Sequence, residues 1–169
     1  VGGDFENILF ITENSYLWCL DSEGNAIWKI FIDGEVLTTP VVNNQKAYIR
    51  LANYEILQID LRQGDIDWRY MHSSPVLAFD GTSALTFSDG VIYGGFGAGK
   101  IVAVHQKSGA FIWEANISQV KGSTDIDRLN DVLSKPIIND SEVYAVSTSG
   151  DLTAIDRTNA SIIWTRKIS

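Results

Sequence analysis

A hairpin pattern that recurs along the chain constrains its fold more than any other feature of the sequence. In the segment Glu55–Trp68, apolar residues alternate over Ile56–Ile59, turn-forming residues follow over Asp60–Gly64, and a second apolar stretch contains the tryptophan. Alternation on both sides of a short polar turn is typical of a β-hairpin. The same succession of residue types surrounds three further tryptophans, so the chain is predicted to be a repeat. The tryptophans of the four copies are Trp28, Trp68, Trp113 and Trp164.

The spacing between equivalent tryptophans, 40, 45 and 51 residues, predicts the blades of a β-propeller, in which about 40 to 50 residues form four strands. Two more strands are predicted before the second, third and fourth hairpins, and one before the first. In the second copy they are Pro40–Val42 and Ala47–Arg50, on either side of a polar turn. We therefore expect an all-β chain, a partial β-propeller of about four four-stranded antiparallel blades. The expected blades cover residues 5–33, where the first strand is missing, and residues 38–72, 84–117 and 135–168.

Two roles are open for the recurring tryptophans. A tryptophan at a fixed position of every repeat can pack between neighbouring blades with its indole N–H bonded locally, or it can form an aromatic platform for a ligand. A ligand site is made once, whereas a contact between blades is made in every blade. The regular recurrence therefore favours packing.

Charge and composition exclude several classes of function. The formal net charge of −8, without a cluster of Lys and Arg, disfavours nucleic acid as a partner, because phosphate binding needs many positive contacts. No stretch reaches the roughly 18 apolar residues of a membrane span. Cys19 is the single cysteine and is expected to pack in a strand. The chain starts at Val1, inside a predicted blade, so we expect it to be part of a longer protein.

No catalytic, cofactor or metal site is predicted. The glycine-rich segment Gly94–Lys100 partly fits a phosphate-binding loop, but Ile101 follows where Ser or Thr is needed, and strands rather than a helix flank it. It is expected to be a turn between the second and third strands of a blade. His72 and His105 are 33 residues apart without a second ligand nearby. His105 stands where Asp opens the other turns, so a local hydrogen bond is expected.

Two connections between blades are longer than a propeller needs. They cover residues 71–83 and 118–134 and contain apolar residues where polar ones would suffice. Because strands alternate in direction, both should emerge on one face, side by side, with the Gly94–Gly99 turn between them. Such loops either bind a partner or plug the underside of the propeller. The expected patch has Leu77, Phe79, Leu129 and Leu133 at its centre and Asp80, Asp127, Arg128 and Asp131 at its rim.

The repeat frame, Asp-x3-Gly-x3-Trp, resembles the tryptophan-docking repeat of pyrroloquinoline-quinone-type propellers and differs from the WD40 repeat. This resemblance implies a fold, not a function. Quinoprotein dehydrogenases of that fold use a vicinal disulfide, which a chain with one cysteine does not supply.

A narrower resemblance rests on Gly122–Val132, Leu77–Ser83 and Glu35–Pro40. These segments are similar to the BamB family, propeller lipoproteins of the machinery that assembles outer-membrane β-barrels. The resemblance implies an eight-bladed, quinone-free, non-enzymatic scaffold, held by a lipid at the periplasmic face of the outer membrane. It also implies binding to the POTRA domains of the barrel-inserting subunit. The alternatives are part of a quinone-dependent dehydrogenase and a propeller module with another protein partner.

The family's contact residues, a Leu-x-Leu-Arg run and an Asp-x-Asp pair, lie in the same two loops. Leu77 matches the first leucine, Phe79 replaces the second, and Asp80 takes the place of Arg. Asp131 matches the first aspartate and Leu133 replaces the second. The resemblance thus implies that the apolar half of the contact is kept. The expected partner-binding residues are Leu77, Phe79, Asp80, Arg128, Leu129, Asp131 and Leu133, and Arg128 or Lys135 would supply the positive charge.

An open arc of blades leaves strand edges and apolar blade faces uncovered. The chain by itself is therefore expected to self-associate. Two copies would complete a ring with the family's eight blades through a closed two-fold pairing.

Overall fold

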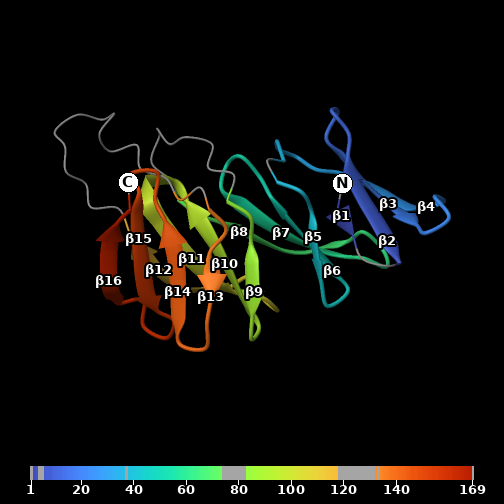
Figure 1. Cartoon of the computed structure of the whole chain (residues 1–169). Coiled ribbons are helices and arrows are strands. Elements are labelled where there is room, and N and C mark those ends of the chain that lie inside the picture. The colour runs from blue at the N-terminus through green and yellow to red at the C-terminus, as the bar shows by residue number, and fades with distance from the viewer. Residues whose placement is uncertain are drawn as a thin grey trace. The chain divides into compact units, whose positions relative to one another are not determined.

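The computed structural model describes residues 2–3, 6–36, 38–73, 83–117, 132 and 134–168. The chain divides into two compact units, Val1–His72 and Ser73–Ser169. Each unit contains two four-stranded sheets (Figure 1).

The first unit holds eight strands. The first sheet has the order β1-β2-β3-β4 and the second β5-β6-β7-β8, with every neighbouring pair antiparallel. The strands are β1 Gly2–Gly3, β2 Asn7–Ile11, β3 Tyr16–Asp21, β4 Ala26–Phe31, β5 Val41–Asn43, β6 Lys46–Arg50, β7 Glu55–Asp60 and β8 Ile66–Met71.

The second unit repeats this arrangement. Its sheets have the orders β9-β10-β11-β12 and β13-β14-β15-β16, again antiparallel throughout. The strands are β9 Thr86–Ser88, β10 Val91–Phe96, β11 Lys100–His105, β12 Phe111–Asn116, β13 Ile137–Ile138, β14 Glu142–Val146, β15 Asp151–Asp156 and β16 Ile162–Lys167, and η1 Gly97–Gly99 is a 3-10 turn.

Four meandering four-stranded sheets confirm the predicted fold class. Two details differ from the prediction. The first blade is not limited to three strands, because β1 pairs with β2 through Gly2↔Leu9 and Gly3↔Ile8. A pair of glycines carries no apolar alternation, so this strand leaves no pattern in the sequence. The glycine-rich segment is also only partly a turn, because β10 continues to Phe96 and includes Gly94 and Gly95.

The same irregularity in every sheet sets the direction of the tryptophans. In each pairing of the third strand with the fourth, the register shifts beside the tryptophan, for instance between Cys19 and Leu20 opposite Trp28. The equivalent shift occurs in the other three sheets. A bulge of this kind bends the strand and turns a side chain toward a new neighbour. The indole Nε1 of Trp28 donates to the carbonyl oxygen of Leu61 in the next sheet at 2.7 Å.

Burial of the tryptophans is less uniform than expected. Trp113 is buried, with 8% of its surface exposed, whereas the other three are partly exposed. Trp28 is one of these three, and its ring covers Gly64 in the neighbouring turn so closely that a Cβ there would lie 2.8 Å from Cδ2.

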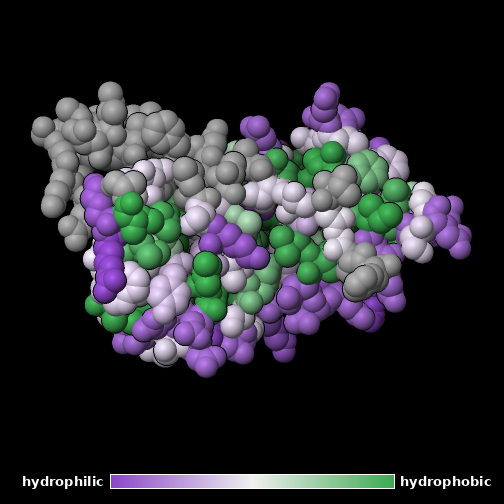
Figure 2. Space-filling view, viewed as in Figure 1, coloured by the Kyte–Doolittle hydropathy of each residue, from purple (hydrophilic) through white to green (hydrophobic). Residues whose placement is uncertain are grey.

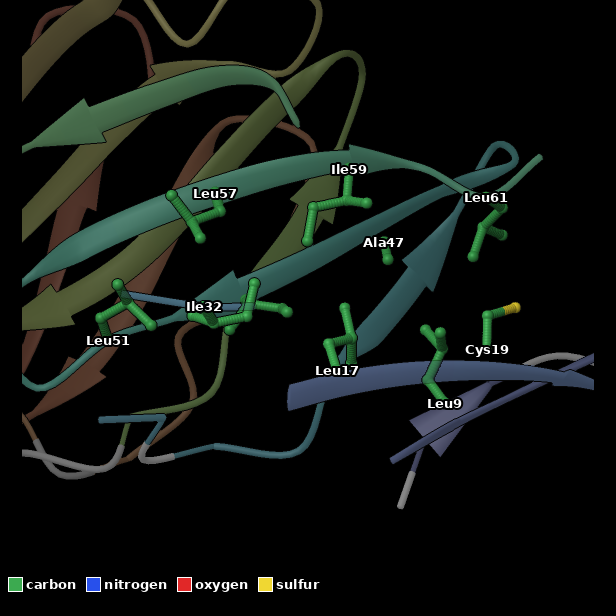
Figure 3. Packing of buried hydrophobic residues seen from close by; sticks show 10 residues of the cluster. Leu9, Leu17, Cys19, Ile32, Ala47, Leu51, Leu57, Ile59 and Leu61 are labelled. Carbon is green, nitrogen blue, oxygen red and sulfur yellow. The ribbon is translucent and has the colours of Figure 1, made fainter. Parts of the chain in front are cut away.

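Aliphatic side chains from both sheets form the core of the first unit. Leu9, Leu17 and Cys19 point from the first sheet toward Ala47 and Ile59 of the second (Figure 3). All five are fully buried, and each large aliphatic side chain removed from water contributes about 1.5–3 kcal/mol. The expectation that Cys19 packs in the core is confirmed.

The core of the second unit includes the end of a loop. Tyr93, Ile101 and Trp113 of one sheet pack with Val143 and Ile155 of the other. Val132 belongs to the same cluster and is fully buried. The long connection that ends at this residue is therefore anchored in the core.

Candidate protein-binding face

The two long connections are the candidate site, and the structure describes their ends. The seven partner-binding residues expected from the sequence, between positions 77 and 133, lie outside the described residues. For the first loop, Met71, His72, Ser73 and Ser83 are described. For the second loop, Val132 and Ser134 are described, as is Ile117 directly before it.

Both ends of the second loop lie on the turn between β10 and β11. The amide of Ile117 donates to the carbonyl oxygen of Gly99 at 2.8 Å, and the amide of Val132 donates to the carbonyl oxygen of Phe96 at 3.5 Å. Val132 also forms an antiparallel bridge with Ser147, just after β14. Within this unit, the described ends of the loop are thus on the same face as the glycine-rich turn.

A shorter version of the same connection occurs in the first unit. There the amide of Ile32 bonds to Ser15 at 2.8 Å, and Val36 forms an antiparallel bridge with Leu51. Ile32 and Val36 are four residues apart, whereas the equivalent Ile117 and Val132 are fifteen residues apart. A link four residues long is enough to join two blades. The eleven additional residues of the second loop are therefore not needed to connect the sheets.

The first loop ends beside the second. The hydroxyl of Ser83 donates to the main-chain carbonyl of Ser134 at 2.8 Å, which brings the carboxyl-terminal ends of both connections together. At the start of the first loop, His72 is buried and its Nδ1 lies 3.3 Å from the Tyr70 hydroxyl. Met71 exposes 69% of its surface directly before the loop. Met71 is not among the site residues predicted from the sequence, although its place at the end of a predicted strand was a usable signal.

A groove beside the loop ends was also not predicted. It has a volume of about 530 Å³ and is lined by strands β9 and β13 together with Lys135 and Pro136, which precede β13. Ile137 exposes 68% of its surface, and Figure 2 shows hydrophobic surface over β13. Lys135, one of the two residues expected to supply a positive charge, is exposed here.

Ion pairs line the loop-bearing ends of two blades. Glu55 at the start of β7 accepts from Arg69 at 3.1 Å. Lys100 at the start of β11 contacts Glu114 at 2.7 Å. In each case the pair joins the third strand to the fourth, so it fixes the strand ends from which the loops emerge.

The opposite face of the second unit is held by Arg157. Its Nε donates to the Tyr93 hydroxyl at 2.7 Å, and its guanidinium forms an ion pair with Asp89 at 2.7 Å. The hydrogen bond to Tyr93 has the largest effect and, together with the contact to Asp89, raises the pKa of Arg157. The same ion pair lowers the pKa of Asp89. This face is thus tied together by interactions between sheets and carries short turns.

At the third hairpin turn, the hydrogen bonds are made mainly by the backbone. The amide of His105 donates to Ala110 at 2.8 Å, and the turn amide of Ala110 donates to the Ser108 hydroxyl at 3.4 Å. The expected local role therefore falls to Ser108 rather than to the imidazole. Among the residues that the structure describes, no cluster of His, Cys, Asp and Glu could hold a metal ion. In the same part of the chain, no helix has the length and apolar character to cross a membrane.

Repeated four-stranded blades, docked by tryptophans and carrying an enlarged loop on one face, define a β-propeller of the pyrroloquinoline-quinone repeat class. Comparison with known families is more specific. The chain belongs to the BamB family, since the model described as "Outer membrane protein assembly factor BamB" matches residues 1–169.

Individual relatives agree with this assignment. The chain is 34% identical over 158 residues to the outer membrane protein assembly factor BamB of Yersinia pestis, an alignment that covers 93% of this chain and 40% of the relative. The chain thus spans about 40% of the length of the curated relatives that it matches.

Solved structures show the same fold. The crystal structure of BamB from Moraxella catarrhalis superimposes with a TM-score of 0.86 at 25% identity, covering 100% of this chain and 52% of that one. A europium-containing methanol dehydrogenase is similar with a TM-score of 0.65 at 17% identity, over 82% of this chain and 26% of that one. The second likeness concerns the fold alone.

Proposed function

We propose that this chain is part of a non-enzymatic scaffold subunit of the outer-membrane β-barrel assembly (BAM) complex. It acts at the periplasmic face of the outer membrane, where a lipid on the longer protein holds it. Its partner is the set of POTRA domains of the barrel-inserting subunit. The binding surface consists of the loops 71–83 and 118–134.

The length and anchoring of the second loop carry this proposal. It is eleven residues longer than the equivalent link between Ile32 and Val36, and both of its ends are buried, at Ile117 and Val132. A long segment held at both ends by a rigid scaffold is where binding residues are commonly found. A plug for the underside of the propeller would not need the charged residues Asp127, Arg128 and Asp131.

The composition of the loops supports a protein partner. An apolar centre with a polar rim is the usual anatomy of a protein interface. Leu77, Phe79, Leu129 and Leu133 would supply the centre. Asp80, Arg128 and Asp131 would supply the rim, together with the exposed Lys135.

The proposal is tested with the longer protein that contains this chain and the POTRA domains of its own barrel subunit. The double substitution Leu77→Ala with Phe79→Ala removes two apolar side chains from the proposed centre. Affinity is expected to fall at least tenfold, about 1.4 kcal/mol. Isothermal titration calorimetry measures the change.

Two control variants lie in turns at the far ends of the same sheets. Gln63 is exposed in the turn before β8, and Lys107 is exposed in the turn before β12. A strand of six residues separates each from the loop-bearing end, roughly 20 Å. Gln63→Ala and Lys107→Ala should leave the affinity unchanged. Equal effects at both ends, or no effect at either, contradict the proposed surface.

A further inference from the structure

A hydroxyl residue occupies the same position in three blades. Thr38, Ser83 and Ser134 each lie three residues before the first strand of a blade, namely before β5, β9 and β13. In two of them the side chain accepts from the second strand of its own blade. The amide of Gly95 lies 3.3 Å from the Ser83 Oγ, and the amide of Val146 lies 3.4 Å from the Ser134 Oγ. The hydroxyl thus fixes where an incoming connection meets its blade.

Ser83 makes an additional link to the next blade. Its hydroxyl donates to the Ser134 carbonyl at 2.8 Å, across 51 residues of sequence. The residue has no exposed surface, so water does not compete for this bond. One side chain therefore joins the end of the first loop to the end of the second.

Close packing leaves little room for another arrangement. A Cβ on Gly95 would lie 2.5 Å from Cγ1 of Val132 and 3.0 Å from the Ser83 Oγ. The backbone of β10 thus touches the last residues of both loops. Val132 is itself fully buried, so neither loop end can shift without moving the core.

We propose that Ser83 is a positioning residue that sets the two long loops relative to each other, through hydrogen bonds to Ser134 and Gly95. In this role the residue touches no partner. It acts through the loop ends, so that the apolar residues of both loops present one surface. The expected effect of Ser83 on partner binding rests on the proposed function. Its effect on the two loops can be measured without a partner.

The test compares two nearly isosteric variants in the longer protein. Ser83→Ala removes the hydroxyl that joins the loop ends. Thr86→Val removes a hydroxyl of the same kind, whose Oγ1 donates to the Pro136 carbonyl at 2.6 Å and also joins the two sheets. The control bond joins strand β9 to Pro136, the residue directly before β13, rather than the ends of the two long loops. Both variants should therefore lose similar stability, and only the first should affect the loops.

Two readouts without a partner measure the coupling. Amide hydrogen exchange reports the opening of the Gly95 N–H. Chymotrypsin cleaves after Phe79 in the first loop and after Leu129 in the second, at rates that follow the population of open forms. Ser83→Ala should increase cleavage in both loops by about threefold or more and accelerate exchange at Gly95, while Thr86→Val leaves both unchanged. If Ser83→Ala does not fold, Ser83→Cys takes its place. Because a thiol is a weaker hydrogen-bond donor than a hydroxyl, loop cleavage and Gly95 exchange in Ser83→Cys should lie above those of the unsubstituted protein and below those expected for Ser83→Ala.

Binding then separates the two proposals. If the unsubstituted protein binds the POTRA domains, Ser83→Ala should weaken binding about tenfold and Thr86→Val should not. Unchanged cleavage and exchange in Ser83→Ala would overturn the positioning role, whatever the binding result. Normal binding by a Ser83→Ala protein with loosened loops would also overturn it. If the unsubstituted protein does not bind, the proposed function fails, and increased cleavage in both loops still supports the positioning role.

Discussion

The indole Nε1 of Trp113 donates a hydrogen bond of 2.9 Å to the main-chain carbonyl of Arg157 in the next sheet. Trp28 makes the equivalent bond to Leu61. In both cases the acceptor directly follows the aspartate that opens a hairpin turn, Asp156 or Asp60. Within each unit, the tryptophan of one blade thus binds the hairpin turn of the following blade, and this bond needs an indole N–H that another large apolar residue would lack.

Substitutions at Trp113 should separate the hydrogen bond from the packing. Trp113→Phe keeps an aromatic ring and loses the donor, so the free energy of unfolding should fall by about 1 kcal/mol. Trp113→Ala also leaves a cavity and should cost about 3–5 kcal/mol. Chemical denaturation measures both. In the control Trp164→Phe, the ring contacts Tyr144 and no indole acceptor lies in the described part of the chain, so the loss should be smaller. Equal losses for the two Phe variants would contradict the docking role.

One turn carries a residue that its backbone does not favour. Gly24, Gly64 and Gly109 have positive φ at the same place in three hairpins, and Ala160 has φ of 63° in the fourth. The left-handed conformation costs a residue with a Cβ about 1 kcal/mol. Ala160→Gly should therefore raise the free energy of unfolding by about 0.5–1 kcal/mol, as measured by chemical denaturation. The reverse change, Gly109→Ala, should lower it by a similar amount. A destabilising Ala160→Gly would show that the strain is relieved in some other way.

The repeat and its strands could be predicted because their signals are local. Alternation, an Asp-to-Gly turn and a fixed tryptophan position each depend on fewer than about ten neighbouring residues. The first strand, Gly2–Gly3, was missed because glycines carry no such alternation. Gly94 and Gly95 were read as part of a turn, whereas they belong to β10. Gly95 has no room for a side chain, because Val132, which is 37 residues away in the sequence, packs directly against it.

The anchoring of the candidate site could be predicted only in part. Strand direction correctly placed the described ends of the second loop, Ile117 and Val132, on the face of the Gly97–Gly99 turn. The bond between Ser83 and Ser134 joins residues too far apart for any local pattern to reveal. A usable signal did exist, because a hydroxyl precedes the first strand of three blades at the same distance, at Thr38, Ser83 and Ser134.

Acid should weaken an ion pair in the second blade. Lys46 contacts both Asp60 and Asp67 at 2.7 Å. The hydrogen bond from Lys46, followed by that from the Arg62 amide, lowers the pKa of Asp60 below its usual 3.8. A carboxyl with a lowered folded-state pKa stabilises the protein above its unfolded pKa, and this stability is lost as the pH falls through the folded value.

Asp60→Asn should therefore reduce the free energy of unfolding by about 0.5–1 kcal/mol at pH 6, as is usual for a partly exposed pair. The difference from the unsubstituted chain should shrink as the pH falls below 3.8 and vanish once the pH lies below the lowered folded-state pKa of Asp60. Urea titrations at several pH values measure it. At pH 6, about 1 M salt should also reduce the difference through screening. A difference independent of pH would mean that the aspartate acts only through its turn hydrogen bonds.

The chain produced by itself should self-associate through its last strand. Ile162 and Ile163 in β16 are 49% and 47% exposed, about as much as the equivalent Phe111 and Ile112 of β12, at 56% and 40%. The tryptophan side of β12, however, is covered by the next sheet, through Val143 and Ile155. Uncovered apolar side chains beside a strand edge favour pairing with another chain. Analytical ultracentrifugation at micromolar concentration should detect a dimer, twice the 18.7 kDa of the chain. Ile162→Ser with Ile163→Ser should shift it toward monomer, whereas Ile112→Ser, an exposed isoleucine of β12, should not. A monomer at all concentrations would show that these side chains do not drive association.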